Sequence, residues 1–199
     1  MEESGLRPTL ERIFGAKTFV CKLKDQDWIF FERGKAMQDK SLLEAALDYQ
    51  KRGFSVIPMG ATVISQNEIK KFCRLPSWAE FQKRRPSEEE IRRWWTQWTD
   101  AQIGVVCGAI SNLIVIDTDT PMAVEEVESL LPDALEVPCH TTPRGGRHYF
   151  FQYREGVKST NKNGIHQFEI HSDGTLAIIP PGQISDGRKY QWIGGRGFE

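Results

Sequence analysis

The sequence predicts an α+β protein in which helices cover one face of a mixed β-sheet. Helix and strand patterns alternate through the first half of the chain, whereas the second half contains mostly strand patterns. Two pairs in that half, Asp173-Gly174 and Asp186-Gly187, are strong signals for tight turns between antiparallel strands. We therefore expect the second half to pair mostly in antiparallel fashion.

Length and composition indicate one domain of ordinary size. The chain has 199 residues, of which 39% are hydrophobic, and it contains 11 Phe and 6 Trp, so it can bury a sizeable core and is not disordered by default. Its formal net charge of −1 does not indicate a globally basic nucleic-acid binder. The sequence has no run of about 18 apolar residues and no signal-like N-terminus, so we expect no membrane span and a cytoplasmic protein.

The N-terminal part contains a possible hairpin and then a clear helix. Within residues 1–40, TFVCKL and DWIFFE have the composition of two short strands. Ser41 and Glu44 form a capping-box pattern, and Gly53 follows as a helix stop. The segment FSVIP then predicts a buried strand that ends at Pro58.

A long polar connection precedes the second predicted helix. Residues 60–86 have no clear periodicity and are expected to be irregular. They contain a basic stretch made up of Lys70, Lys71, Arg74, Lys83, Arg84 and Arg85. Ser87 and Glu90 form another capping box, which places a helix start there. The apolar stripe on this helix is expected to be core rather than a base-stacking surface; it consists of Ile91, Trp94, Trp95 and Trp98.

The remaining elements are mostly strands. IGVVCG and NLIVIDTD read as buried strands, and Thr120-Pro121 begins a helix that runs through Leu131. Four further strands are expected at His148–Tyr153, His166–His171, Thr175–Ile179 and Lys189–Ile193.

The four cysteines do not form a metal-binding pattern. Cys21, Cys73, Cys107 and Cys139 include no C-x-x-C pair, so we expect reduced thiols. Cys139 lies beside His140, but adjacent residues on an extended segment point in opposite directions.

Two aspartates at the end of a predicted strand are candidate metal ligands. Asp117 and Asp119 are two positions apart, so on a strand their side chains face the same side. Close carboxylates repel each other unless a cation neutralises them, and their hard oxygen ligands favour Mg²⁺ or Mn²⁺. The alternative is a strand end whose aspartates cap the next helix and face water.

A third carboxylate lies on a later predicted strand. Glu169 stands between Phe168 and Ile170, so it requires a partner. If its strand lies beside that of Asp117, the three carboxylates would form the set that a two-metal phosphoryl-transfer site requires. Alternatively, Glu169 pairs with a nearby Arg or Lys.

The segment PRGGRHYFF is a candidate phosphate-binding turn. Gly145 and Gly146 permit close approach of the backbone to a phosphate, while Arg144, Arg147 and His148 supply donors. Residues 117–136 carry seven acidic and no Lys or Arg residues, whereas residues 144–196 carry eight basic and four acidic ones. This separation suits a nucleotide polymerase, although solvated turns and helices also produce such patterns.

Seven segments follow one another in a fixed order: GFSVIP, RRPSEEEIRRWWTQW, AQIGVVCG, LIVIDTD, TPRGGRHYFF, FEIHSDGTLAIIPPG and GRKYQWI. Together they resemble the bifunctional primase-polymerase (prim-pol) domain of the archaeo-eukaryotic primase superfamily, which is common in phages and plasmids. The resemblance covers about residues 41–193. We therefore expect a prim-pol catalytic domain over residues 41–199 and an N-terminal extension over residues 1–40.

The resemblance implies a fold and a set of functional residues. The fold would have an RRM-like mixed or antiparallel catalytic sheet, flanking helices and a smaller N-terminal α/β unit. Asp117, Asp119 and Glu169 would hold two Mg²⁺ or Mn²⁺ ions, and His148 would contact the incoming nucleoside triphosphate. Further phosphate contacts are expected from Arg144, Gly146, Arg147, Arg188 and Lys189.

Three positions depart from the pattern of this family. Glu169 stands where Asp is more usual, and Gly146 stands where a small hydroxyl residue often precedes the histidine. His171 replaces an Arg that family members often carry, and it either tunes Glu169 or fills space.

We expect a DNA-directed primase-polymerase that acts on nucleotides with a single-stranded DNA template and primer. It is expected to be a monomer, and relatives often continue into a helicase region. One alternative is a metal-dependent nuclease that uses the same carboxylates. The other is a non-catalytic single-strand-binding module in which Trp78 or Trp192 stacks on bases.

Overall fold

A computed structural model describes residues 40–65, 68–131, 137–160, 168–194 and 197–198. The predicted hairpin within residues 1–40 and Cys21 lie outside the described residues. The described helices are α3 (Leu42–Lys51), α4 (Glu88–Gln97) and α5 (Pro121–Leu130), with short 3₁₀ turns η2 (Ala79–Gln82) and η3 (Ala109–Ser111). None of these helices is long and apolar enough to cross a membrane.

The described strands form two antiparallel sheets. Sheet A has the order β2-β1-β3-β8, and sheet B has the order β7-β4-β6-β5-β9. The strands are β1 (Val56–Ser65), β2 (Glu68–Cys73), β3 (Gln102–Val106), β4 (Leu113–Thr118), β5 (Cys139–Thr141), β6 (Arg147–Gln152), β7 (Phe168–His171), β8 (Leu176–Ile179) and β9 (Gln191–Trp192).

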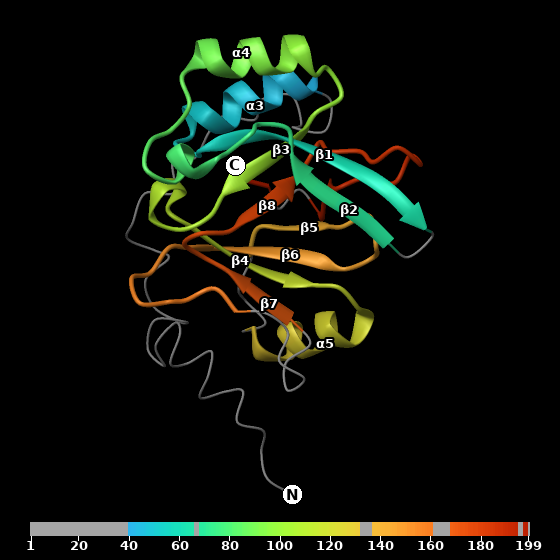
Figure 1. The fold of residues 1–199 in the computed structure, drawn as a ribbon. Helices are drawn as coiled ribbons and strands as arrows, with labels where there is room; N and C mark the ends of the chain where they lie inside the picture. Colours follow the sequence, from blue (N-terminus) through green and yellow to red (C-terminus); the bar gives the residue numbers. More distant parts are fainter. Residues whose placement is uncertain (1–39, 66–67, 132–136, 161–167, 195–196, 199) are drawn as a thin grey trace, which may run out of the picture.

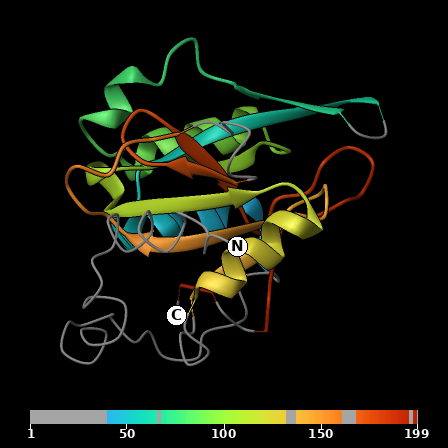
Figure 2. The ribbon, with the colours of Figure 1, turned by 90° about the horizontal axis from the view of Figure 1, so that it is seen from below.

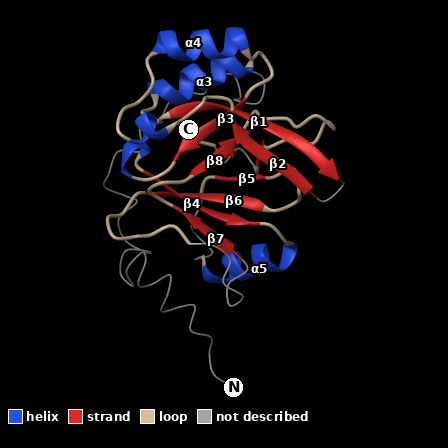
Figure 3. Ribbon diagram, viewed as in Figure 1, coloured by secondary structure: helices blue, strands red, loops and turns tan. Residues whose placement is uncertain are grey.

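The elements stack in four layers, which Figure 1 shows from the side and Figure 3 shows by type of element. α3 and α4 lie over sheet A, sheet B lies beneath sheet A, and α5 covers the far face of sheet B. The view from below in Figure 2 shows α5 lying across sheet B. The α+β class and the prim-pol fold are confirmed, but the helices do not lie on one face of a single mixed sheet.

The turn at Asp173-Gly174 differs from the predicted hairpin. Gly174 has φ +80°, as the turn requires, but the flanking strands β7 and β8 belong to different sheets. The turn therefore carries the chain from sheet B to sheet A. Its Asp173 carboxylate accepts a hydrogen bond from the backbone N–H of Ala109, which ties the crossover to η3.

The predicted start of the second helix is confirmed. The Ser87 hydroxyl accepts a hydrogen bond from the backbone N–H of Glu90, and the Glu90 carboxylate accepts one from the backbone N–H of Ser87. Arg84 donates to the same carboxylate at 2.7 and 2.8 Å. Ile91, Trp94 and Trp95 are buried in the core, as predicted, and Trp98 packs against them.

The prediction that residues 60–86 are irregular was wrong for the first part of that range. β1 does not end at Pro58 but continues to Ser65, and β2 pairs with it from Glu68 to Cys73. Pro58 lies opposite the end of β2, where its carbonyl accepts a hydrogen bond from the backbone N–H of Arg74, the residue that follows β2. The short strand β5 was also not predicted.

The ion pair at the start of α4 yields a pH-dependent stability prediction. Hydrogen bonds from Arg84 lower the pKa of Glu90 from 4.5 to about 2. The carboxylate is thus more acidic in the folded state, so its stabilisation is fully present above the unfolded pKa and is lost as the pH falls through the folded pKa. Glu90→Gln should lower the free energy of unfolding by about 1 kcal/mol near pH 7.

Denaturant unfolding from pH 7 down to pH 3 checks this expectation. The difference in the free energy of unfolding between the wild type and Glu90→Gln should become smaller as the pH falls below 4.5. Glu89→Gln is the control, because it makes the same change of charge in the same turn and leaves the contacts of Arg84 and Ser87 in place. A difference that stayed constant with pH would contradict the prediction.

Candidate active site

The two faces of sheet B have different surroundings. On β4, Leu113 and Val115 belong to the core that includes sheet A, whereas Ile114 and Ile116 pack with Val127 of α5. Asp117 is two residues beyond Val115, so its side chain lies on the face toward sheet A. The candidate site therefore lies on the side of sheet B that faces sheet A.

A row of paired residues crosses this face. Glu169 of β7 pairs with Asp117 of β4, Asp117 pairs with His148 of β6, and His148 pairs with His140 of β5. Residues directly opposite each other in an antiparallel pair project on the same face, with Cβ atoms about 4.5–5.5 Å apart. Strand register thus brings together three of the predicted site residues: Asp117, Glu169 and His148.

The Asp117 carboxylate lies between two histidines. Its Oδ1 is 3.2 Å from Nε2 of His148, and its Oδ2 is 3.6 Å from Nε2 of His171. Burial would raise the pKa of Asp117, but the charge and contact of His148, followed by His171 and Lys71, hold this pKa well below its usual range. The carboxylate is therefore ionised near neutral pH.

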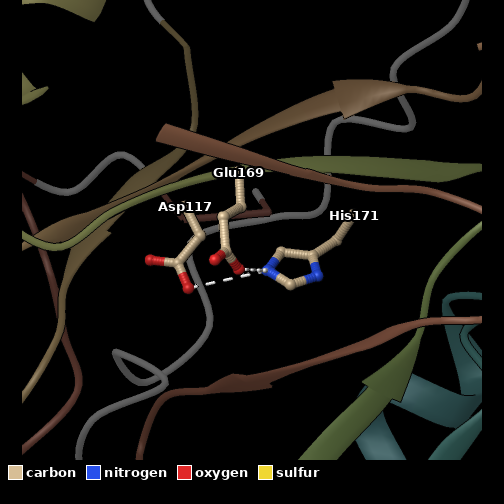
Figure 4. Close-up of side chains that lie close together, drawn as sticks. All are labelled: Asp117, Glu169 and His171. Carbon is tan, nitrogen blue, oxygen red and sulfur yellow. Dashed lines mark ion pairs between the residues drawn. The ribbon is translucent and has the colours of Figure 1, made fainter. Parts of the chain in front are cut away.

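His171 also faces Glu169, as Figure 4 shows. The distance from His171 Nε2 to Glu169 Oε2 is 3.9 Å. Among the described residues, His171 is thus an ion-pair partner of Glu169. Asp117, Glu169 and His171 each offer one ligand atom within 4.8 Å of the others.

Asp119 follows the end of β4 and has a different neighbour. Its Oδ2 is 3.5 Å from a guanidinium nitrogen of Arg144 in the glycine turn. Arg144 on the turn is thus a cationic partner of Asp119. Metal binding by Asp119 remains a prediction.

The glycine turn is pressed against the end of β4. A Cβ atom at Gly146 would overlap the backbone carbonyl of Thr118 and would lie 2.9 Å from Cα of Asp119. The Thr118 hydroxyl also links β4 to the residue after the turn, because it accepts a hydrogen bond from the backbone N–H of Arg147 and donates one to the Arg147 carbonyl. Gly146 therefore replaces the hydroxyl residue of the family pattern at a position with no room for a side chain.

The other predicted basic residues lie around this turn in different ways. Arg147 is on the α5 side of sheet B, where its guanidinium pairs with Glu128, so the structure does not bring it to the carboxylates. Arg188 donates to the carbonyl of Pro143 at 3.1 Å and thereby ties its own loop to the turn. Lys189 is exposed. Phosphate contacts by these three residues remain predictions.

Lys71 reaches the site from sheet A. The residue as a whole is exposed, yet its ammonium group interacts with Tyr190 and with both aspartates. Burial of the ammonium would lower its pKa, but Tyr190, Asp117 and Asp119 outweigh that effect and raise it. Sequence reasoning placed Lys71 only in a basic stretch, because nothing local revealed that β2 pairs with β1 in a register that turns this side chain inward.

A comparison with family models identifies the domain. The model for the N-terminal domain of bifunctional DNA primase/polymerases matches residues 46–198, which is most of the chain. The chain belongs to the bifunctional DNA primase/polymerase family. A comparison with curated proteins gives no significant match. Membership of this family implies nucleotidyltransferase activity of the primase or polymerase type and binding of DNA and nucleotides. Members of the family are typically metal-dependent.

The site residues of this primase/polymerase domain fit a divalent cation. Asp117, Glu169 and His171 are all partly exposed and have ligand atoms close together. In addition, Asp117 Oδ1 is buried without a hydrogen-bond partner among the described residues. An ionised carboxylate whose buried Oδ1 has the ion-pair contact with His148 but no hydrogen bond of good geometry, beside two further ligands, is a suitable donor set for such an ion.

His140, which is fully buried, packs against His148 at the end of the row that lies next to the aromatic core. The ring centroid of His140 is 4.6 Å from that of His148, and its Nδ1 is 3.0 Å from the carbonyl of Thr141. Because a carbonyl only accepts, Nδ1 carries the proton of the neutral ring. Burial first, and the charge of His148 second, hold the pKa of His140 well below its usual range. The sequence suggested His140 only as a doubtful metal ligand beside Cys139.

The proposed base-stacking tryptophans contribute to the core of this primase/polymerase domain. Trp192 packs against His140, Phe150 and Phe198, with ring centroids 5.1–5.5 Å apart. Trp78 is half-buried against the same core cluster. Both residues are of intermediate exposure, and stacking on bases stays a prediction.

The contact of Gly146 with β4 leads to a steric prediction. Gly146→Ala should displace the Thr118–Asp119 backbone, lower the free energy of unfolding by about 1–3 kcal/mol and reduce nucleotide incorporation. Thermal unfolding and primer extension measure the two effects. Gly197→Ala is the control, because a Cβ there would meet its nearest atoms at an ordinary 3.7 Å. Equal stability of both variants would refute the steric account.

Proposed function

We propose that this domain is a DNA-directed primase-polymerase. A primer 3′-hydroxyl, or that of an initiating nucleotide, attacks the α-phosphate of an incoming nucleoside triphosphate and releases pyrophosphate. The observation that supports this proposal is the row of Glu169, Asp117 and His148 across sheet B. It groups carboxylates beside cationic residues on the face of sheet B toward sheet A, as phosphoryl transfer requires.

The proposed metal ligands are Asp117, Asp119 and Glu169, which would hold two Mg²⁺ or Mn²⁺ ions. Such ions, when bound, activate the attacking hydroxyl and offset the charge of the triphosphate. Asp117 is held ionised for this purpose by His148 and His171. His148, whose side chain is 2% exposed, would orient Asp117 in addition to the triphosphate contact that the family resemblance implies.

Cations around the carboxylates would bind the triphosphate. Arg144 pairs with Asp119 across 3.5 Å and could exchange this partner for a phosphate. Lys71 would approach the same phosphates from sheet A, and Arg188 would hold the glycine turn in place through Pro143. Gly146 and Lys189 are proposed as further contacts, whereas Arg147 is paired with Glu128 on the α5 side of sheet B.

The template would follow exposed lysines of the basic stretch. Arg74 and Arg84 in that stretch are ion-paired with acidic side chains, at 2.6 Å to Asp100 and 2.7 Å to Glu80. Lys70 and Lys83 are exposed. We therefore assign the proposed contacts with template phosphates to these two lysines, which would make binding salt-dependent.

Removing both aspartates tests the proposal directly. Asp117→Ala/Asp119→Ala should abolish incorporation of nucleotides in primer extension with Mg²⁺ or Mn²⁺, because the cations lose two ligands, while the circular dichroism spectrum stays unchanged. The control is Glu125→Ala/Glu126→Ala, which removes two negative charges from α5 on the far side of sheet B. Undiminished extension by the first variant would reject the assignment.

The same assay separates the alternatives. A nuclease would shorten the labelled DNA without added nucleotides, and nucleoside triphosphates would not raise its thermal stability. A non-catalytic module would bind single-stranded DNA without metal and incorporate nothing.

Two neighbouring lysines should have separable effects. Because its ammonium lies beside the carboxylates, Lys71→Met should lower incorporation by about 10²-fold or more and raise KM for the nucleotide. Lys70 projects from the opposite face of β2, so Lys70→Met should instead weaken template binding and reduce its salt dependence. Steady-state kinetics with varied nucleotide and template provide the comparison, and matching effects of the two variants would disprove the assignment.

A further inference from the structure

His171 occupies a position that the acidic pattern of the family does not explain. It lies two residues after Glu169 on β7, and its strand partner is Val115 on β4. Its Nε2 faces both carboxylates, at 3.6 Å from Asp117 Oδ2 and 3.9 Å from Glu169 Oε2. Figure 4 shows both carboxylates directed toward this nitrogen.

An independent observation also points to a ligand of Asp117. The His148 side chain is only 2% exposed, and neither of its ring nitrogens has a partner with hydrogen-bond geometry in the described part of the chain. Its Nε2 is directed at Asp117 Oδ1, which is itself buried and without such a partner. Buried polar atoms are normally satisfied, so this arrangement leaves coordinating capacity at Asp117.

We propose that His171 is a protein ligand, with Asp117 and Glu169, of a cation site that favours Mn²⁺ and other first-row transition-metal ions over Mg²⁺. This inference deepens the proposed function and rests on it for the role of the cation. The binding itself is measured without nucleotide or DNA.

The chemistry of the donors determines the preference. Mg²⁺ favours oxygen ligands and releases its water reluctantly, so an imidazole contributes little to its affinity. Transition-metal ions accept imidazole nitrogen together with carboxylate oxygen. His171 therefore adds a nitrogen ligand to the two carboxylates.

The experiment uses the intact chain and Mn²⁺ as the probe. Titration followed by electron paramagnetic resonance gives the Mn²⁺ affinity, and competition gives that of Mg²⁺. Electron spin echo envelope modulation detects ¹⁴N of a coordinated imidazole. In His171→Asn the nitrogen coupling should disappear, and the Mn²⁺/Mg²⁺ affinity ratio should fall by at least about tenfold. His148→Asn should keep the nitrogen coupling, which identifies the histidine responsible.

A second variant keeps the test decisive if His171→Asn does not fold. His171→Asp supplies oxygen in place of nitrogen, so it should bind both ions, lack the nitrogen coupling and shift the preference toward Mg²⁺. Nitrogen coupling that persisted in either His171 variant, or an unchanged affinity ratio, would overturn the inference. Selective Mn²⁺ binding by a chain that incorporates no nucleotide would instead uphold the inference and reject the proposed function.

Discussion

The candidate site depends on the antiparallel register of β4 with its two neighbours. Because Asp117 is directly opposite Glu169 on one side and His148 on the other, three polar side chains must project on one face of sheet B. A shift of one residue in either pairing would turn these side chains into the core beneath α5. The register is stabilised by the apolar residues that alternate with them, since Ile116, Tyr149 and Ile170 pack together on the α5 side. The packing of the far face thus fixes the position of the polar groups.

Charge balance is the second constraint on the site. Removing an unpaired carboxylate from water costs several kcal/mol, and Asp117 is only 14% exposed. The structure offsets this cost with His148 and His171, which lie 3.2 and 3.6 Å from the carboxylate, and with the charge of the Lys71 ammonium. These groups come from three strands of two sheets, so the ionised state of Asp117 depends on the assembled fold. Binding of a cation and a triphosphate would therefore exchange existing partners rather than create charge in an empty space.

Sequence reasoning predicted the elements that have local signals. Ser87 with Glu90 marked a helix start, and the alternation around Asp117 and Glu169 marked two strands whose register the structure then supplied. Sequence reasoning failed where a feature depends on contacts between residues that are far apart in the sequence. Nothing in the sequence near Asp173-Gly174 shows that the next strand joins the other sheet, and nothing near Lys71 shows that β2 lies opposite Asp117. Likewise, the reason for Gly146 became clear only when the Thr118 carbonyl was located beside it.

The two sheets form the site together, and the connection from β7 to β8 that joins them is short. β8 joins sheet A directly after the turn that ends β7, so the strand carrying Glu169 and His171 is coupled to the sheet carrying Lys71. The turn is anchored at Asp173, whose carboxylate accepts from Ala109 N–H at 3.0 Å and from the Tyr153 hydroxyl at 2.8 Å. A change in the separation of the sheets would therefore move the carboxylates and the ammonium relative to each other. In this arrangement, the spacing between the negative and positive groups is a property of sheet packing, which holds it more rigidly than a pair of exposed side chains could.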